Sequence, residues 1–109
     1  MGGSDLFTGT LDILILQTLR SGPHHGYAIG RVLRERSDGV LDVEEGALYP
    51  ALHRLEARGF LRASWAASET GRRAKFYRLT PDGEERLERL ADQWRLFSGA
   101  VSEVLEAKG

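Results

Sequence analysis

Tyr49, His53 and Arg54 carry side chains suited to hydrogen bonding with nucleic acid. Tyr49 and His53 are one helical turn apart, in a stretch whose leucines recur at helical spacing. Their polar groups can reach base edges or phosphates, and the arginine can bind guanine or phosphate. The stretch therefore predicts a helix whose outer face contacts DNA. Two alternatives stay open: the Tyr49 ring packs against the preceding helix, and His53 is an ordinary exposed histidine.

A second basic group follows in a loop that contains a glycine. Arg72 and Arg73 end this loop, and Lys75 begins the strand-like segment that follows it. Apolar and polar residues alternate in the two flanking segments, 61–66 and 75–79, as they do in strands. A basic loop tip has no core to join, so phosphate contacts are expected from a β-hairpin here. The alternative is a charge run that is merely solvated.

Two helices are expected before this region. The first is apolar nearly all round and follows residues 1–7, a frayed end or an arm, with Thr8 or Thr10 as its N-cap. The second runs from His24 to about Ser37. A helix that is apolar on all sides is buried on more than one side, so a second subunit is expected to cover part of the first helix.

The helix that carries Tyr49 has a marked start and end. Pro50 lacks an N–H and is tolerated in a first turn, so the helix should begin close to Gly46. Gly59 suits the left-handed position after its last residue. Before it, Val40–Val43 forms a short extended link that can pair as a small strand.

The final helix starts with Thr80 as N-cap and Pro81 as its first residue, and it runs to about Ala107, roughly 35–40 Å. Its apolar residues are spaced 3, 4, 3, 4 and 3 apart, as in helices that pack on another helix. Its length favours a dimer over a stripe that folds back on its own subunit. The predicted dimer interface comprises Leu11, Leu14, Ile15, Leu87, Leu90, Trp94, Phe97, Val101 and Val104.

Three helices, a basic hairpin and a long helix predict a winged helix-turn-helix, mainly α within an α+β class. Residues 8–80 would form the DNA-binding domain and residues 81–107 the dimerisation helix of the same compact unit. The predicted DNA-binding residues are Gly46, Ala47, Tyr49, Pro50, His53, Arg54, Arg72, Arg73 and Lys75.

Four segments of the chain resemble the PadR family of bacterial transcriptional regulators. They are residues 9–16, 22–27, 46–55 and 73–80, among which His-Gly-Tyr and Leu-Tyr-Pro-Ala-Leu form a specific pair. The resemblance covers nearly the whole chain, and the single long C-terminal helix is similar to that of the compact subfamily. It implies a homodimeric repressor, and many members respond to small aromatic or lipophilic molecules.

The departures from this family pattern are mild. Ala47 and Phe76 stand where the family often has a hydroxyl residue and a tyrosine, and Ala74 replaces a common basic residue, which weakens wing contacts slightly. In related dimers a central tryptophan pair frames a ligand pore, so the resemblance implies Trp94 and Phe97 as effector-binding residues. Plain interface packing of both is the alternative.

Several classes of function are not expected from the composition. The chain of 109 residues should form one domain, and it has no cysteine for a disulfide, a thiolate metal site or a nucleophile. Adjacent residues do not share a helix face, so His24 and His25 are not expected to bind metal, and His25 more readily caps a helix. No catalytic constellation appears, so neither an enzyme nor a cofactor is expected.

The partners follow from charge and hydropathy. The net charge is only −1, but residues 53–78 hold seven cations and two anions, which favours one face that attracts polyanions. No membrane span or signal peptide is evident, so a cytoplasmic protein without a membrane partner is expected. We expect a DNA-binding transcriptional regulator with double-stranded DNA and a second copy of itself as partners. The alternative is a winged-helix module that binds another protein and no DNA.

Overall fold

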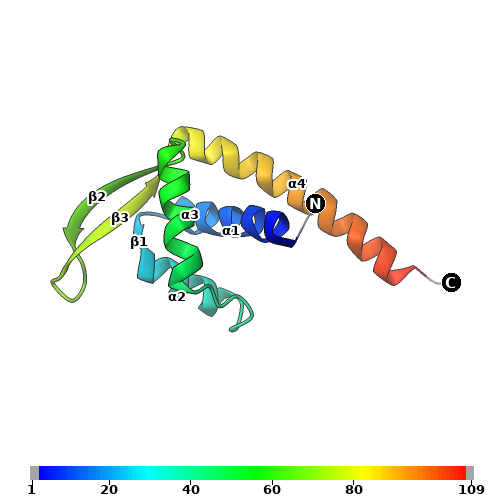
Figure 1. Cartoon of the computed structure of the whole chain (residues 1–109), viewed down its shortest axis with the longest axis horizontal. Helices are drawn as coiled ribbons and strands as arrows, with labels where there is room; N and C mark the ends of the chain where they lie inside the picture. Colours follow the sequence, from blue (N-terminus) through cyan, green and yellow to red (C-terminus); the bar gives the residue numbers. More distant parts are fainter. Residues whose placement is uncertain (1–2, 108–109) are drawn as a thin grey trace.

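The computed structural model describes residues 3–107, with side chains from residue 9 onward. Four helices and a small sheet follow the order that the sequence predicts for a winged helix (Figure 1). The elements are α1 (Gly3–Arg20), β1 (His24–His25), α2 (Gly26–Arg36), α3 (Glu45–Ala57), β2 (Leu61–Ala67), β3 (Arg73–Leu79) and α4 (Pro81–Glu106). The predicted fold class is therefore confirmed.

The core forms around α1, which contacts α2, α3, α4 and β3. Its main members are Leu11, Ile15, Leu16, Leu19, Ile29, Leu33, Leu48, Leu52, Leu55, Leu61, Tyr77 and Leu87. The chain's own elements thus cover α1 on several sides, which accounts for its apolar character without a second subunit. The expectation that a partner covers part of α1 was wrong for Leu11 and Ile15, which are already buried here.

The sheet has three antiparallel strands in the order β1-β3-β2. The predicted hairpin is confirmed, with Leu61 opposite Leu79 and Ala67 opposite Arg73. The third strand was expected in the wrong place. His24 and His25 pair with Tyr77 and Phe76 of β3, whereas residues 40–43 form no strand.

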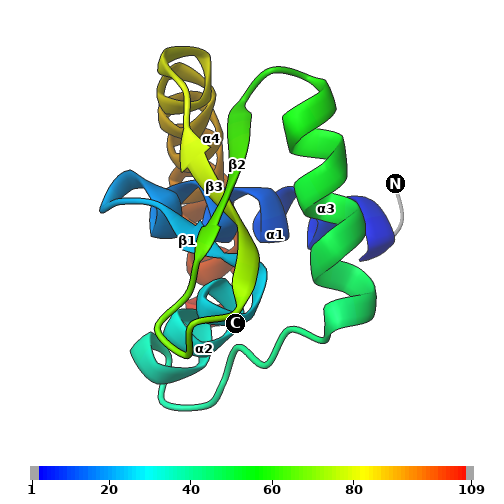
Figure 2. The ribbon, with the colours of Figure 1, turned by 90° about the vertical axis from the view of Figure 1, so that its left-hand side faces the viewer.

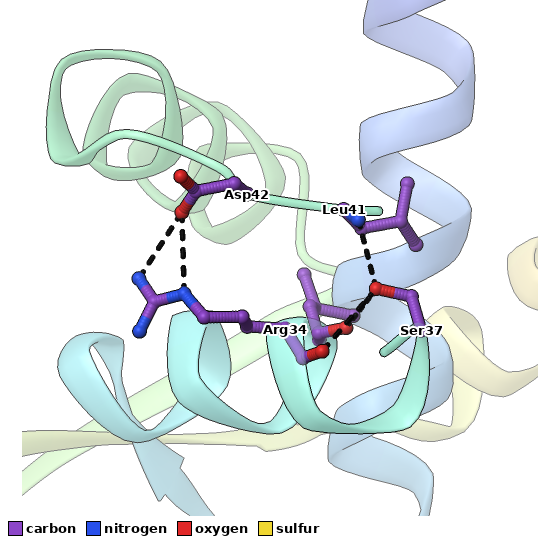
Figure 3. A network of polar contacts seen from close by, with 5 residues as sticks. Arg34, Ser37, Leu41 and Asp42 are labelled. Atoms are coloured by element: carbon purple, nitrogen blue, oxygen red, sulfur yellow. Dashed lines mark hydrogen bonds and ion pairs between the residues drawn. The ribbon is translucent and has the colours of Figure 1, made fainter. Parts of the chain in front are cut away.

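Side chains of α2 hold the link between α2 and α3 in place of strand pairing (Figure 3). The Arg34 guanidinium donates to Oδ1 of Asp42 from Nη2 at 3.1 Å and from Nε at 3.3 Å. The Ser37 hydroxyl accepts the Leu41 N–H at 2.8 Å and lies 2.8 Å from the Leu33 carbonyl. These contacts satisfy backbone and side-chain groups locally, so the link needs no neighbouring strand.

The ends of the helices agree with the sequence in part. Thr80 caps α4 by accepting the Gly83 N–H at 3.0 Å, and His25 caps α2 by accepting the Ala28 N–H at 3.1 Å. Gly59 follows α3 with φ of +84°, in the left-handed region that glycine adopts freely.

The start of α1 differs from the expectation, whereas the start of α3 agrees with it and only the position of Pro50 within the helix does not. α1 begins at Gly3, so neither Thr8 nor Thr10 is its N-cap; no proline interrupts the segment before them, and the helix continues through both. α3 begins at Glu45, close to Gly46 as expected, but Pro50 is its sixth residue rather than a first-turn residue. Because Pro50 has no N–H, the Gly46 carbonyl lacks its usual i+4 donor, and Gly46 is exposed where water can hydrate it.

The long helix α4 leaves the hairpin, passes along α1 and then extends past the other helices (Figure 1). This projection gives the molecule a longest dimension of 58 Å against 29 and 24 Å in the other directions. Leu87 is buried and Leu90 is half-buried against the core. The rest of the apolar stripe is exposed, namely Trp94, Phe97, Val101 and Val104.

Candidate nucleic-acid interface

The helix α3 places its apolar residues on the core and its polar side in solvent. Leu48, Ala51, Leu52 and Leu55 are buried, and Gly46, Pro50 and His53 are exposed. Figure 2, which faces the hairpin, shows α3 beside it and α1 behind both. The outer side of α3 and the hairpin can therefore contact the same partner molecule at once. Ala47 is half-buried against the core.

Tyr49 combines packing with exposure. Its ring lies directly over Gly26 in the first turn of α2, where a Cβ would be only 2.7 Å from the ring. Burial raises the pKa of Tyr49, and the nearby Glu45 carboxylate raises it further. The residue is nevertheless 37% exposed, so its ring braces α3 on α2 while part of the side chain faces outward.

Arg54 does not project freely from α3. Its Nη2 donates to the Asp12 carboxylate of α1, and this carboxylate is nearly buried. Burial raises the pKa of Asp12, while the Arg54 guanidinium, with Arg58 and Arg86 at longer range, opposes the rise. The expected contact between Arg54 and DNA has to compete with this ion pair. The hydrogen bond instead fixes α3 on α1.

The predicted basic residues of the hairpin differ in their freedom. Arg72 and Arg73 are exposed, and neither forms an ion pair among residues 9–107. The Arg73 guanidinium stacks 5.3 Å from the ring centroid of Trp65. Lys75 donates to Glu56 of α3 at 3.2 Å, and this hydrogen bond raises the pKa of Lys75. Lys75 therefore ties the hairpin to α3.

A cleft of about 460 Å³ separates α3 from the hairpin. Three residues predicted to bind DNA line this cleft: Tyr49 and His53 from α3, and Lys75 from β3. Three further residues line the cleft that were not predicted to contact DNA, namely His25, Tyr27 and Trp65. Tyr27 and Trp65 are 65% and 58% exposed, and aromatic residues this exposed on a small domain are the signal that indicates a binding surface.

The residues predicted for the dimer interface divide into three groups by their exposure. Leu11, Ile15 and Leu87 are buried in their own chain and offer no surface to a partner, which corrects their assignment. Leu14 and Leu90 are half-buried. Trp94, Phe97, Val101 and Val104 are exposed between 40% and 75%.

Comparisons with known proteins agree with this geometry. A model of the PadR-like family of transcriptional regulators matches residues 15–89. The chain belongs to the PadR-like family. As such it is a transcriptional regulator, and the winged helix is the DNA-binding fold of that family.

Individual relatives match nearly the full length of this PadR-like chain. "Uncharacterized protein X" of Lysinibacillus sphaericus is 30% identical over 103 residues, which span 94% of this chain and 91% of that protein. A transcriptional regulator from Clostridium thermocellum has a solved structure with a TM-score of 0.82 and 30% identity, covering 94% and 97% of the two chains. The solved structure of a PadR family regulator from Eggerthella lenta has a TM-score of 0.78 and 33% identity, and the match covers 95% of this chain and 88% of that one.

The described part of this PadR-like chain contains no group of three or more acidic, histidine or cysteine residues placed to hold a metal ion. None of its described helices is long and apolar enough to cross a membrane.

Proposed function

We propose that the chain acts as a homodimeric repressor that binds an inverted-repeat operator. The observation that carries this proposal is the exposed apolar stripe of α4, which runs from Trp94 to Val104 beyond the chain's own core. A second copy of the stripe is the partner with matching chemistry, because both helices would bury leucine, valine and aromatic surface from water.

A two-fold dimer would present two copies of the α3 face, residues 46–53, and two hairpins. Inverted-repeat DNA matches such symmetry when its half-sites are one turn apart, about 34 Å. In each subunit the exposed Arg72 and Arg73 would contact phosphates while Tyr49 and His53 face the groove. Repression follows if the bound dimer blocks access to a promoter.

The proposal extends to a small effector. Trp94 and Phe97 lie on the same exposed stripe, with ring centroids 6.4 Å apart and a tilt of 39° between the ring planes. In a dimer these rings and their copies could stack on a planar aromatic or lipophilic molecule. Such a ligand would change the separation of the two α3 helices and release the operator.

The operator is tested by selecting duplexes from a random pool and measuring their binding at about 50 and 200 mM salt. The selected sequences should be inverted repeats with half-sites one turn apart, and affinity should fall steeply with salt. Binding that is absent or independent of salt would contradict the proposal. Transcription from a promoter that contains the selected site should decrease when the protein is added.

The effector is tested on a Trp65→Phe protein, in which Trp94 is the only remaining tryptophan. A planar aromatic dye should quench Trp94 fluorescence and weaken operator binding over the same concentration range. Phe97→Ala should shift the quenching of Trp94 and the loss of operator binding to the same new range of dye concentration. Quenching without any change in operator affinity would refute the effector role.

A further inference from the structure

A second hollow, of about 320 Å³, lies between α2 and the tip of the hairpin. Three arginines line it, Arg31 from α2 and Arg72 and Arg73 from the hairpin. The other lining groups include the Ser68 and Thr70 hydroxyls. Positive charge and hydroxyl donors around a small hollow favour an oxyanion.

Aromatic rings hold two of these arginines in place. The Arg31 guanidinium lies 6.0 Å from the ring centroid of Tyr27, and that of Arg73 lies 5.3 Å from the ring centroid of Trp65. Each contact restricts a long side chain that would otherwise sample many rotamers. A guanidinium that is already oriented loses less entropy when it binds an anion.

A carboxylate already stands beside this hollow. Glu69, at the hairpin tip, has its Oε1 3.9 Å from Nη2 of Arg31, and it lines the same cavity. Both side chains are well exposed, so the ion pair is weak and can exchange for a stronger anion. Glu69 is the one anionic residue of the hairpin tip, and here it neutralises an arginine that was not predicted to bind DNA.

We propose that this hollow is a phosphate-binding site in which Arg31 and Arg73 hold one phosphodiester of double-stranded DNA after Glu69 has moved away. The inference rests on the proposed DNA binding and adds a contact from α2 to it. The hollow shares His25, Tyr27 and Ala74 with the cleft beside α3, so the two form one continuous surface. A duplex whose bases face Tyr49 and His53 would pass its backbone over Arg31.

The test compares Arg31→Gln with Arg36→Gln, which removes the same charge from an exposed position on the same helix outside the hollow. Binding to a duplex is measured across a range of salt, and circular dichroism verifies that each variant is folded. Arg31→Gln should reduce the slope of log affinity against log salt by roughly one unit per subunit. Arg36→Gln should keep the wild-type slope, and Arg31→Lys should restore it.

A second variant examines the exchange with Glu69. Glu69→Gln should bind duplex DNA about two- to fivefold more tightly, because an exposed ion pair no longer competes with the phosphate. An unchanged slope in Arg31→Gln, or weaker binding by Glu69→Gln, would overturn the inference. If inorganic phosphate displaces DNA from the wild type more than chloride of equal ionic strength does, and not from Arg31→Gln, free phosphate competes with the phosphodiester for this hollow, which supports the site.

These outcomes are separable from a failure of the proposed function. If the wild type binds no duplex at any salt concentration, both proposals fail. If it binds with a steep salt dependence that Arg31→Gln shares fully, only the phosphate site in the hollow fails.

Discussion

The two halves of α4 have the same apolar spacing and opposite surroundings. In the first half, Gly83 and Leu87 are buried against the core and Leu90 is half-buried. In the second half, Trp94, Val101 and their neighbours on the stripe are exposed. A heptad-like spacing thus indicates a surface that packs on something, but it does not distinguish the chain's own core from a partner. Substitutions can separate residues that pack within the chain from residues left for a partner.

The largest effect is expected from Gly83→Ala. A Cβ at this position would lie 2.2 Å from the Phe60 carbonyl oxygen and 2.7 Å from Cδ1 of Leu79. The backbone at Phe60 would have to move, so the free energy of unfolding should fall by on the order of 3 kcal/mol. Urea unfolding followed by circular dichroism measures this change.

Gly99 in the outer half provides the matched control. A Cβ there meets nothing within 4 Å, so Gly99→Ala should stabilise the helix by about 1 kcal/mol through helix propensity alone. Opposite signs at two glycines of one helix would support the division of α4. Equal effects would contradict it.

Leu87→Ala should have the next largest effect. Leu87 is 1% exposed, so the truncation leaves a cavity and should lower the free energy of unfolding by about 2–3 kcal/mol. The variant should keep the wild-type oligomeric state, because Leu87 has no surface for a partner. Sedimentation of the folded variant measures that state, and dissociation into monomers would place Leu87 in the interface after all.

Among the arginines, Arg54 pairs within the chain, whereas Arg72 and Arg73 are left for a partner. Arg54→Ala should lower the free energy of unfolding by about 1–2 kcal/mol, because it leaves the Asp12 carboxylate without its donor. It should leave the salt slope of DNA binding unchanged, whereas Arg72→Ala should reduce the slope by roughly one unit per subunit. A reduced slope in Arg54→Ala would return this residue to the DNA contacts.

The smallest effect concerns the pH dependence of Asp12. Its pKa is raised by folding, so the folded state binds the proton more tightly, and this contribution to stability is lost as pH rises from 3.8 through the folded pKa. The wild type should therefore lose stability relative to Asp12→Asn over that range. If the wild type instead gained stability relative to Asp12→Asn as pH rises, the attraction of Arg54 would outweigh the effect of burial on the pKa of Asp12.

Local signals predicted much of this fold. Thr80 with Pro81 marked the start of α4, Gly59 marked the end of α3, and alternation marked both hairpin strands. These features depend on neighbouring residues, so a sequence window contains them. β1 was missed because two histidines show no alternation, and their pairing partners on β3 lie more than 50 residues further along the chain.

The candidate site was less predictable for the same physical reason. The side chains of Tyr49, Arg54 and Lys75 are of types that suit DNA contacts, but the groups they contact in the structure come from other elements. Asp12 is 42 residues from Arg54, and Glu56 is 19 residues from Lys75. Spacing shows which residues share a helix face, and it does not show which distant carboxylate neutralises a cation.

The most direct test of the account is the mass of Val101→Asp in solution, measured by sedimentation equilibrium together with duplex binding. Val101 is exposed on the outer half of α4, so the aspartate should not disturb the core. We predict that the wild type sediments at twice the chain mass of 12.1 kDa. The folded variant should sediment at the chain mass and bind inverted-repeat DNA much more weakly. A wild type that sediments as a monomer, or a monomeric variant with full operator affinity, would contradict the central claim.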